Sequence, residues 1–143
     1  MRTNLVTMLD GIGLAAALGI EPTAQFFDDM HHLAAHVSAI DSPVYVHGHN
    51  YGGASPPLVG HPVLASLVRA CLGARVAMAL DALVVHLGKA SEAAVGFLAR
   101  QDLLDRRRCL PRLPHPSGAN GRRVRSYAER RADLARAVLM WSA

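Results

Sequence analysis

The sequence predicts an α/β fold in which helices cover both faces of a short, mostly parallel sheet, a three-layer α/β/α arrangement. Short β-branched or apolar runs alternate with longer segments whose apolar residues recur at helical spacing. The run at 82–87, Ala-Leu-Val-Val-His-Leu, is apolar without alternation, which is typical of a parallel strand buried on both faces. Because 143 residues are one domain's worth of chain, we expect a single domain over 1–143.

Local signals predict the order of the elements. A helix over 5–18 has Gly19 as its stop, and Pro22 lies where a second helix, over 23–37, would begin. The segment 43–46 is short and β-branched, which indicates a strand, and a Gly/Pro-rich loop over 48–57 follows it. The other expected elements are a helix over 62–80, the strand over 82–87, a helix over 88–98, a weaker strand over 109–113 and a last helix over 122–140.

The composition limits the class of protein. Hydrophobic residues make up 51% of the chain and aromatic residues only 5%. No apolar run reaches the roughly 18 residues that a membrane span needs, so no membrane partner is expected. The two cysteines, Cys71 and Cys109, lie far apart and form no CxxC motif, which argues for a reducing cytoplasm and against a disulfide framework. An iron–sulfur cluster usually needs four thiolates, and no cofactor is expected.

The charge is distributed unevenly along the chain. Residues 1–99 contain four Lys/Arg and seven Asp/Glu, a balance of −3, whereas residues 100–143 contain eleven Arg and four Asp/Glu, a balance of +7. A basic block of this kind is the expected footprint of a partner with a phosphate backbone. A solvated arginine-rich helix would have the same composition. The charge therefore predicts where a nucleic acid would lie, not that one binds.

The loop over 114–121, Pro-His-Pro-Ser-Gly-Ala-Asn-Gly, carries the most information, because ligands in such sheets bind beyond the carboxyl ends of the strands. We call it the histidine loop. Two prolines bracket His115 and stiffen the backbone, while Ser117 and Gly118 allow a partner to come close. Asn120 is expected to be the N-cap of the last helix, whose start would form an anion site. A stiff surface turn is the alternative. Three arginines follow: Arg122, Arg123 and Arg125.

This stretch, HPSGAN, follows an apolar strand and precedes a basic helix, and it resembles the second conserved motif of the uracil-DNA glycosylase superfamily. The turn at 87–90, Leu-Gly-Lys-Ala, is similar to that superfamily's next-to-last strand-to-helix junction. The segment 43–53, Pro-Val-Tyr-Val-His-Gly-His-Asn-Tyr-Gly-Gly, resembles the strand and loop that bear its base-reading residue. The resemblance covers roughly 43–137, the C-terminal two-thirds of the chain.

The resemblance implies a hydrolase of base-excision DNA repair. Such enzymes flip a damaged nucleotide into a pocket and cleave the N-glycosidic bond between base and sugar. It implies that His115 donates a hydrogen bond to a carbonyl oxygen of the departing uracil as negative charge develops there. Asn50 is the candidate for reading the imide edge of the base, and His47 or His49 could take its place. A turn-stabilising role for Asn50 fits the sequence equally well.

The resemblance also implies how DNA would be held. Ser117, Gly118 and the backbone N–H groups near Asn120 would bind the phosphates that flank the flipped nucleotide. Ala119 lies where many relatives have a bulky wedge, so we expect weak extrusion from a duplex or a preference for single strands. The expected partner is uracil-containing DNA, single- or double-stranded. Backbone contacts are expected from three arginines: Arg122, Arg123 and Arg125.

The superfamily's first motif has no counterpart in these 143 residues. That motif, GxDPG or similar, supplies the residue that positions the attacking water. A misassigned start or truncated gene would explain this, and so would a shortened relative that has lost the chemistry. Glycosylase activity is therefore expected only where the motif is supplied. A sheet without its first strand would expose an edge that favours self-association.

Two other classes of function compete with the enzyme. His31, His32 and His36 include an i, i+4 pair on the expected helix, and two further histidines alternate at 47 and 49, spacings that can hold zinc. No HExxH or HxE…PCxxC pattern accompanies them, so no metal is expected. A non-catalytic nucleic-acid-binding module that uses the arginine-rich end is the main alternative. A subunit of a small-molecule enzyme would rest on the fold alone.

Overall fold

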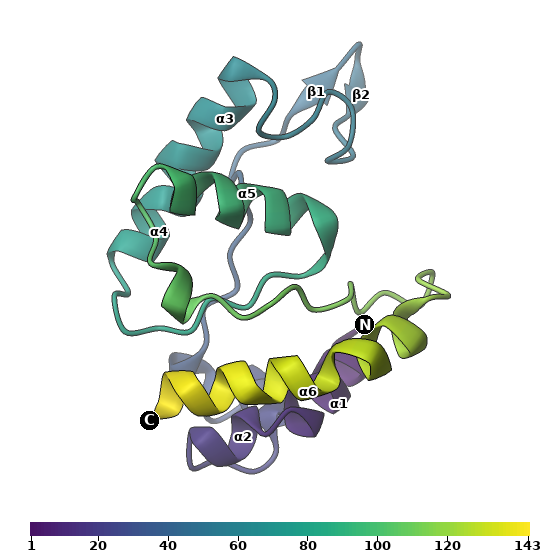
Figure 1. Ribbon diagram of the computed structural model, residues 1–143. Helices are drawn as coiled ribbons and strands as arrows, with labels where there is room; N and C mark the ends of the chain where they lie inside the picture. Colours follow the sequence, from purple (N-terminus) through teal and green to yellow (C-terminus); the bar gives the residue numbers. More distant parts are fainter. The chain divides into compact units, whose positions relative to one another are not determined.

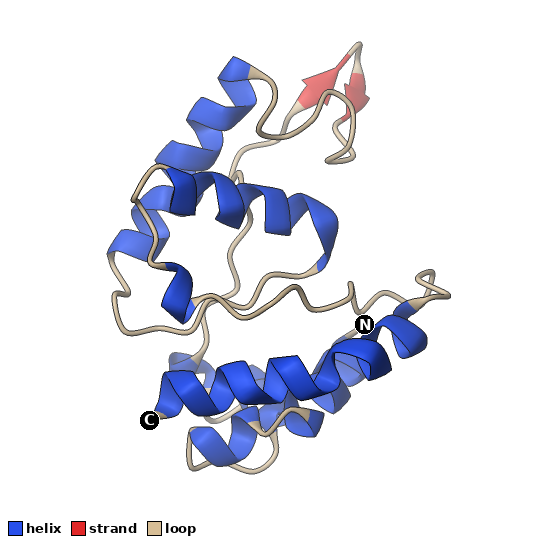
Figure 2. Cartoon of the chain, viewed as in Figure 1, coloured by secondary structure: helices blue, strands red, loops and turns tan.

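The computed structural model describes all 143 residues, which divide into two compact units. Unit 1 combines both ends of the chain, Met1–His36 and Leu110–Ala143, and unit 2 is Val37–Cys109. Helices predominate in both units, and the only strands form one short pair (Figures 1 and 2). The expected single domain over 1–143 stays a prediction. No helix is both long enough and apolar enough to cross a membrane.

Unit 1 is built from α1 (Arg2–Gly11), α2 (Leu14–Ala17) and the long α6 (Arg123–Ser142), with 3-10 turns η1 (Thr23–Phe27) and η2 (His31–Leu33). The helix expected over 5–18 is divided, because Gly13 has φ +80° and starts a new helix. The predicted end of that helix at Gly19 is confirmed. Gly19 has φ +67°, and the N–H groups of Gly19 and Ile20 donate to the carbonyls of Ala16 and Ala15, as in a Schellman motif.

The helix expected over 23–37 is wrong. The chain forms the separate turns η1 and η2, and Asp28 between them has φ −132° and ψ −114°, outside the helical region. A tertiary contact sets the start of this segment, because the Thr23 N–H donates to the Asp10 carboxylate at 2.8 Å. Thr23 and Phe26 are the buried residues of η1, so the apolar pattern is satisfied by one short turn.

The core of unit 1 lies where α6 contacts α1 and α2 (Figure 1). Leu134 and Val138, four residues apart on one face of α6, are fully buried. Two polar contacts fix α6 to α1: the Tyr127 hydroxyl donates to the Met8 carbonyl at 2.9 Å, and Arg131 Nε donates to the Gly11 carbonyl at 2.8 Å. A Cβ at Gly11 would overlap the Tyr127 hydroxyl, so a larger residue at this position would displace the Tyr127 side chain.

Unit 2 is built from α3 (Pro62–Val68), a single π-helical turn η3 (Arg69–Gly73), α4 (Ala74–Ala77), α5 (Gly88–Arg100) and η4 (Arg106–Arg108). The helix expected over 62–80 begins at its proline, as predicted, and ends at Ala77. The helix expected from Gly88 is also confirmed. The core of unit 2 is formed by Leu58, Leu64, Val68, Leu72, Val76, Ala94, Val95, Leu98 and Leu104.

The expected parallel sheet is wrong. The only sheet is an antiparallel hairpin of β1 (Tyr45–Val46) and β2 (His49–Asn50). Within unit 2, the residues expected in the strands over 82–87 and 109–113 form one isolated parallel bridge, Val84 with Cys109. Val84 and Val85 are only half-buried. Unit 2 builds its core from helices instead, so the fold is mixed helix with a small sheet. Self-association through a sheet edge stays a prediction.

Candidate functional site

The histidine loop lies in unit 1, and its histidine is exposed to solvent. Leu113 and Pro116 are fully buried and Pro114 is buried, whereas His115 is exposed. The two buried prolines hold the backbone on both sides of the imidazole. A stiff backbone at this position is what the spacing of the prolines predicts.

A backbone hydrogen bond orients the His115 ring and favours one tautomer of the neutral imidazole. The Ser117 N–H donates to His115 Nδ1 at 3.3 Å. A peptide N–H can only donate, so Nδ1 is the acceptor, and the proton of a neutral imidazole then lies on Nε2. His115 therefore has a preset Nε2–H donor on an exposed ring.

Three consecutive carbonyls of the histidine loop each accept a hydrogen bond from a side chain. Asn120 Nδ2 donates to the His115 carbonyl at 3.1 Å, and Arg123 Nη1 donates to the Ser117 carbonyl at 2.7 Å. The carbonyl between them, of Pro116, accepts from Asn4 Nδ2 at 2.9 Å. Asn4 lies in α1, 112 residues away, and no sequence signal singled it out.

Asn120 is not the N-cap that the sequence predicts. The N-cap of α6 is Arg122, which makes no side-chain cap. Asn120 lies two residues earlier, where its carbonyl accepts the Arg123 N–H at 3.0 Å and its side chain donates back to the His115 carbonyl. The Ser117 hydroxyl accepts the Ala119 N–H at 3.2 Å, and Gly118 is exposed beside it. Their predicted contacts with phosphate stay predictions.

The three arginines at the start of α6 differ in the hydrogen bonds and ion pairs that their side chains make. Arg123 is half-buried and holds the histidine loop, whereas Arg125 is exposed and pairs with Glu129 at 2.9 Å. Arg122 is exposed, and its side chain makes no hydrogen bond or ion pair within the chain. Arg122 is thus the least engaged of the three cations beside the loop.

The arginines of the basic block divide between the two units. Arg108 is buried in unit 2, where its guanidinium donates to the Val76 carbonyl at 2.7 Å and to the Ala79 carbonyl. Arg131 holds a carbonyl of α1. Part of the positive charge that predicted a nucleic-acid footprint therefore stabilises helix ends and helix contacts.

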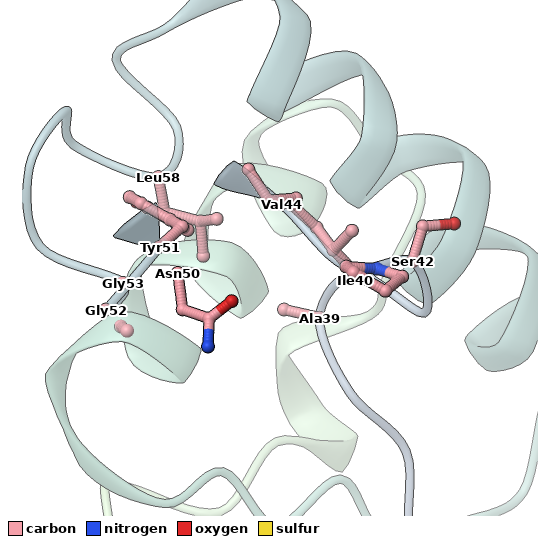
Figure 3. Close-up of a pocket in the computed structure, with 11 residues that line it drawn as sticks. Ala39, Ile40, Ser42, Val44, Asn50, Tyr51, Gly52, Gly53 and Leu58 are labelled. Atoms are coloured by element: carbon pink, nitrogen blue, oxygen red, sulfur yellow. The ribbon is translucent and has the colours of Figure 1, made fainter. Parts of the chain in front are cut away.

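Unit 2 contains a pocket of about 450 Å³ beside the β-hairpin. Its walls come from the segment before β1, from β2 and the turn after it, and from the start of α5. Asn50 carries the exposed carboxamide on this wall, and Figure 3 shows it directed into the space between Gly52 and Ala39. The lining residues are Ala39, Ile40, Ser42, Pro43, Val44, Asn50, Tyr51, Gly52, Gly53, Leu58 and Ala90.

The hairpin fixes the backbone of Asn50 and leaves its side chain free. Asn50 is opposite Tyr45 in the ladder, and the next residue extends the pairing, since the Tyr51 N–H donates to the Val44 carbonyl at 2.8 Å. The Tyr51 hydroxyl donates to the Pro56 carbonyl at 2.7 Å, and burial raises the pKa of Tyr51. The Asn50 carboxamide has no hydrogen-bond partner within the chain, so it does not stabilise the loop.

The two histidines considered with Asn50 lie outside the pocket. His47 and Gly48 have φ +51° and +79° and form the two-residue turn of the hairpin, as a type I′ turn requires. His49 precedes Asn50 on β2, and adjacent residues of a strand point to opposite faces. Of the three candidates for base reading, only Asn50 lines the pocket.

The histidine pair considered for zinc does not lie on a helix face, because the chain leaves the helical path after Leu33. His36 stacks on Phe27 with ring centroids 5.0 Å apart, and His31 Nδ1 is 3.1 Å from the Asp28 carbonyl oxygen. No three His, Cys, Asp or Glu side chains lie close enough together to hold a metal ion. Both cysteines are free.

The chain is similar to a protein of known sequence from a bacterium. The chain is 36% identical over 144 aligned positions to uncharacterized protein YoxB of Bacillus subtilis (strain 168). The alignment covers all of this chain and 56% of YoxB, so the chain spans little more than half the length of its relative. No protein-family model matches the chain. No solved structure matches it either.

Proposed function

We propose that this chain is a uracil-DNA glycosylase-like protein of base-excision repair. It binds a flipped uracil or related deaminated base and, where a water-positioning residue is supplied, promotes hydrolysis of the N-glycosidic bond. In that reaction water adds hydroxyl to C1′ of the sugar, and the base leaves with the bonding electron pair and is then protonated. The observation that carries the proposal is the exposed Nε2–H donor of His115.

The histidine loop supports a role in stabilising the leaving base. A neutral imidazole can donate to a developing oxyanion without changing its own charge, and the Ser117 N–H on Nδ1 keeps the donor on the outer nitrogen. Three side-chain hydrogen bonds to successive carbonyls hold the loop in advance, so little reorganisation is needed during the reaction. One such donor contributes about 2.7–4 kcal/mol in comparable oxyanion sites.

The pocket of unit 2 supports binding of a small planar base. Its volume, about 450 Å³, lies in the range of small-molecule sites, and its walls are mostly apolar. The Asn50 carboxamide offers one acceptor and two donors, which match the alternating N–H and C=O groups of a pyrimidine imide edge. Because this carboxamide has no partner within the chain, it is available to a ligand.

The start of α6 supports contact with the DNA backbone. Arg122 is exposed and unengaged, and Arg125 is exposed in a weak i, i+4 pair. The first N–H groups of a 20-residue helix add a positive dipole end. Binding through these groups would release counterions and would therefore weaken as salt rises.

Base recognition is tested first by binding, because binding does not require the water-positioning residue. We expect the chain to bind a single-stranded oligonucleotide with one uracil more tightly than the same oligonucleotide with cytosine, measured by fluorescence anisotropy. Asn50→Ala should reduce this preference about three- to tenfold, the range for the loss of one hydrogen bond. His61→Ala, which removes an exposed histidine without side-chain hydrogen bonds, is the matched control. Equal binding of both oligonucleotides would refute the proposal.

Excision is tested by the appearance of abasic sites in the uracil oligonucleotide. Where excision occurs, His115→Ala should slow it at least about tenfold, because a single oxyanion donor in comparable sites contributes about 10²–10³ in rate. His61→Ala should leave the rate unchanged.

A catalytically deficient nucleic-acid-binding module of the same kind is the second candidate function. The observation in its favour is that no GxDPG-like segment occurs in the 143 residues. It predicts uracil-dependent binding without abasic sites, so the two assays together distinguish it from the enzyme.

A further inference from the structure

One contact of the histidine loop joins the two ends of the sequence. The Asn4 carboxamide, in the first turn of α1, donates to the Pro116 carbonyl at 2.9 Å. We propose that Asn4 is a positioning residue for His115, which keeps the imidazole in its Nε2–H tautomer by fixing the peptide between Pro116 and Ser117. The catalytic part of this inference rests on the proposed function, but its structural part does not.

The argument depends on the planarity of the peptide bond. The carbonyl oxygen of Pro116 and the N–H of Ser117 belong to the same rigid peptide unit. Asn4 holds the oxygen of that unit at 2.9 Å, and His115 Nδ1 accepts the N–H on its opposite side at 3.3 Å. A donor that fixes the oxygen therefore also fixes the direction of the N–H, and with it the nitrogen of His115 that remains unprotonated.

The other two side-chain hydrogen bonds of the loop cannot fix the direction of the Ser117 N–H. Asn120 holds the carbonyl of the peptide between His115 and Pro116, which has no N–H because the second residue is proline. Arg123 holds the carbonyl of the peptide that follows Ser117, whose N–H belongs to Gly118. Asn4 alone acts on the peptide that carries the N–H to the imidazole.

The hydrogen bond from Asn4 to the Pro116 carbonyl also makes the Ser117 N–H a better donor to His115. An amide whose carbonyl accepts a hydrogen bond is polarised, and its N–H becomes a better donor. The Asn4 side chain is half-buried and Pro116 is fully buried, which limits competition from water for the Pro116 carbonyl. Losing the Asn4 donor should therefore both loosen the peptide and weaken the Ser117 N–H as a donor.

The test is ¹⁵N NMR of the full chain with Asn4→Leu, which keeps the size of the side chain but removes the donor. We expect the His115 ring nitrogens of the wild type to show protonation at Nε2 only, and those of the variant to move toward a tautomer mixture. Exchange of the Ser117 amide hydrogen should rise about tenfold, equivalent to about 1.4 kcal/mol. Gln25→Ala, which removes another amide-to-carbonyl bond in unit 1, should change neither signal.

A second measurement needs no variant and applies even where Asn4→Leu fails to fold. In the wild-type protein the Asn4 side-chain amide protons should exchange more slowly than those of Asn50, which have no partner. Equal exchange of the two carboxamides would overturn the inference, as would a folded Asn4→Leu protein with the wild-type tautomer.

The outcomes separate this inference from the proposed function. A changed tautomer in a chain that neither prefers nor excises uracil would support the positioning role and refute the function. In a chain that excises uracil, Asn4→Leu should lower the rate of the chemical step more than it weakens uracil binding. An unchanged tautomer and an unchanged rate would leave the function standing and refute the role of Asn4.

Discussion

Replacing Arg108 with methionine should destabilise unit 2 by about 1.5–3 kcal/mol, the range for one hydrogen bond to a charged group. Methionine keeps the apolar stem and removes the guanidinium, which donates to the Val76 carbonyl in the last turn of α4 and to the Ala79 carbonyl just after it. Val76 is buried, so its carbonyl would lose its charged donor with limited replacement by water. Ala79 is exposed, and water can replace the second bond, so we count only the first.

The measurement is urea unfolding followed by far-UV circular dichroism. The matched control is Arg107→Ala at the neighbouring arginine, whose side chain is 92% exposed and pairs with Asp105 at 2.8 Å. This surface pair is screened by solvent, so its removal should change the midpoint little. If Arg108→Met shifts the midpoint no more than Arg107→Ala, the assignment of Arg108 to the end of α4 is wrong.

Three further predictions concern unit 1, alkaline stability and salt. Gly11→Ala should lower stability by about 1–3 kcal/mol in thermal unfolding despite alanine's higher helix propensity, because the new Cβ meets the Tyr127 hydroxyl; a more stable variant would contradict the packing. Burial raises the pKa of Cys109 above its ordinary 9.0 and that of Tyr127 above its ordinary 10.0. The folded state therefore holds these protons more tightly, so their stabilisation is complete below the ordinary values and is lost as pH rises through the raised ones. The urea midpoint should fall above about pH 9, and less steeply in Tyr127→Phe; a midpoint independent of pH would contradict this. Arg122→Gln should reduce the slope of log K against log salt for single-stranded DNA by about 0.7. Arg136→Gln, at an exposed ion pair further along α6, should not.

Several helix starts and ends could be predicted from single residues and their neighbours in the sequence. Proline at position 62 has its φ preset for the first turn of a helix, and the structure begins α3 there. Glycine at position 19 accepts the left-handed conformation that ends α2, as its place in the sequence predicts. The start and extent of α6 are close to the expected 122–140. These features depend on residues near one another in the chain, which is why they could be read from it.

Elements that depend on distant partners were not predictable in the same way. The apolar run at 82–87 carries the composition of a buried strand, but whether a strand forms depends on which neighbours pair with it. Here Val84 shares one bridge with Cys109, and the core of unit 2 is helical. The segment 23–37 has helical spacing, but it forms two short 3-10 turns, and Asp28 between them lies outside the helical region.

In the candidate site, too, some features were predictable from neighbouring residues and others depended on distant partners. The sequence by itself predicted that His115 would lie in a stiff loop, because prolines restrict φ regardless of what surrounds them. The exposure of the imidazole was decided by the tertiary structure. The sequence also singled out Asn50, which lines the pocket. Only the tertiary structure decided which ring nitrogen of His115 is free to donate, because that depends on where the Ser117 N–H points. The contact from Asn4 spans 112 residues, and no local pattern encodes an orientation fixed from that distance.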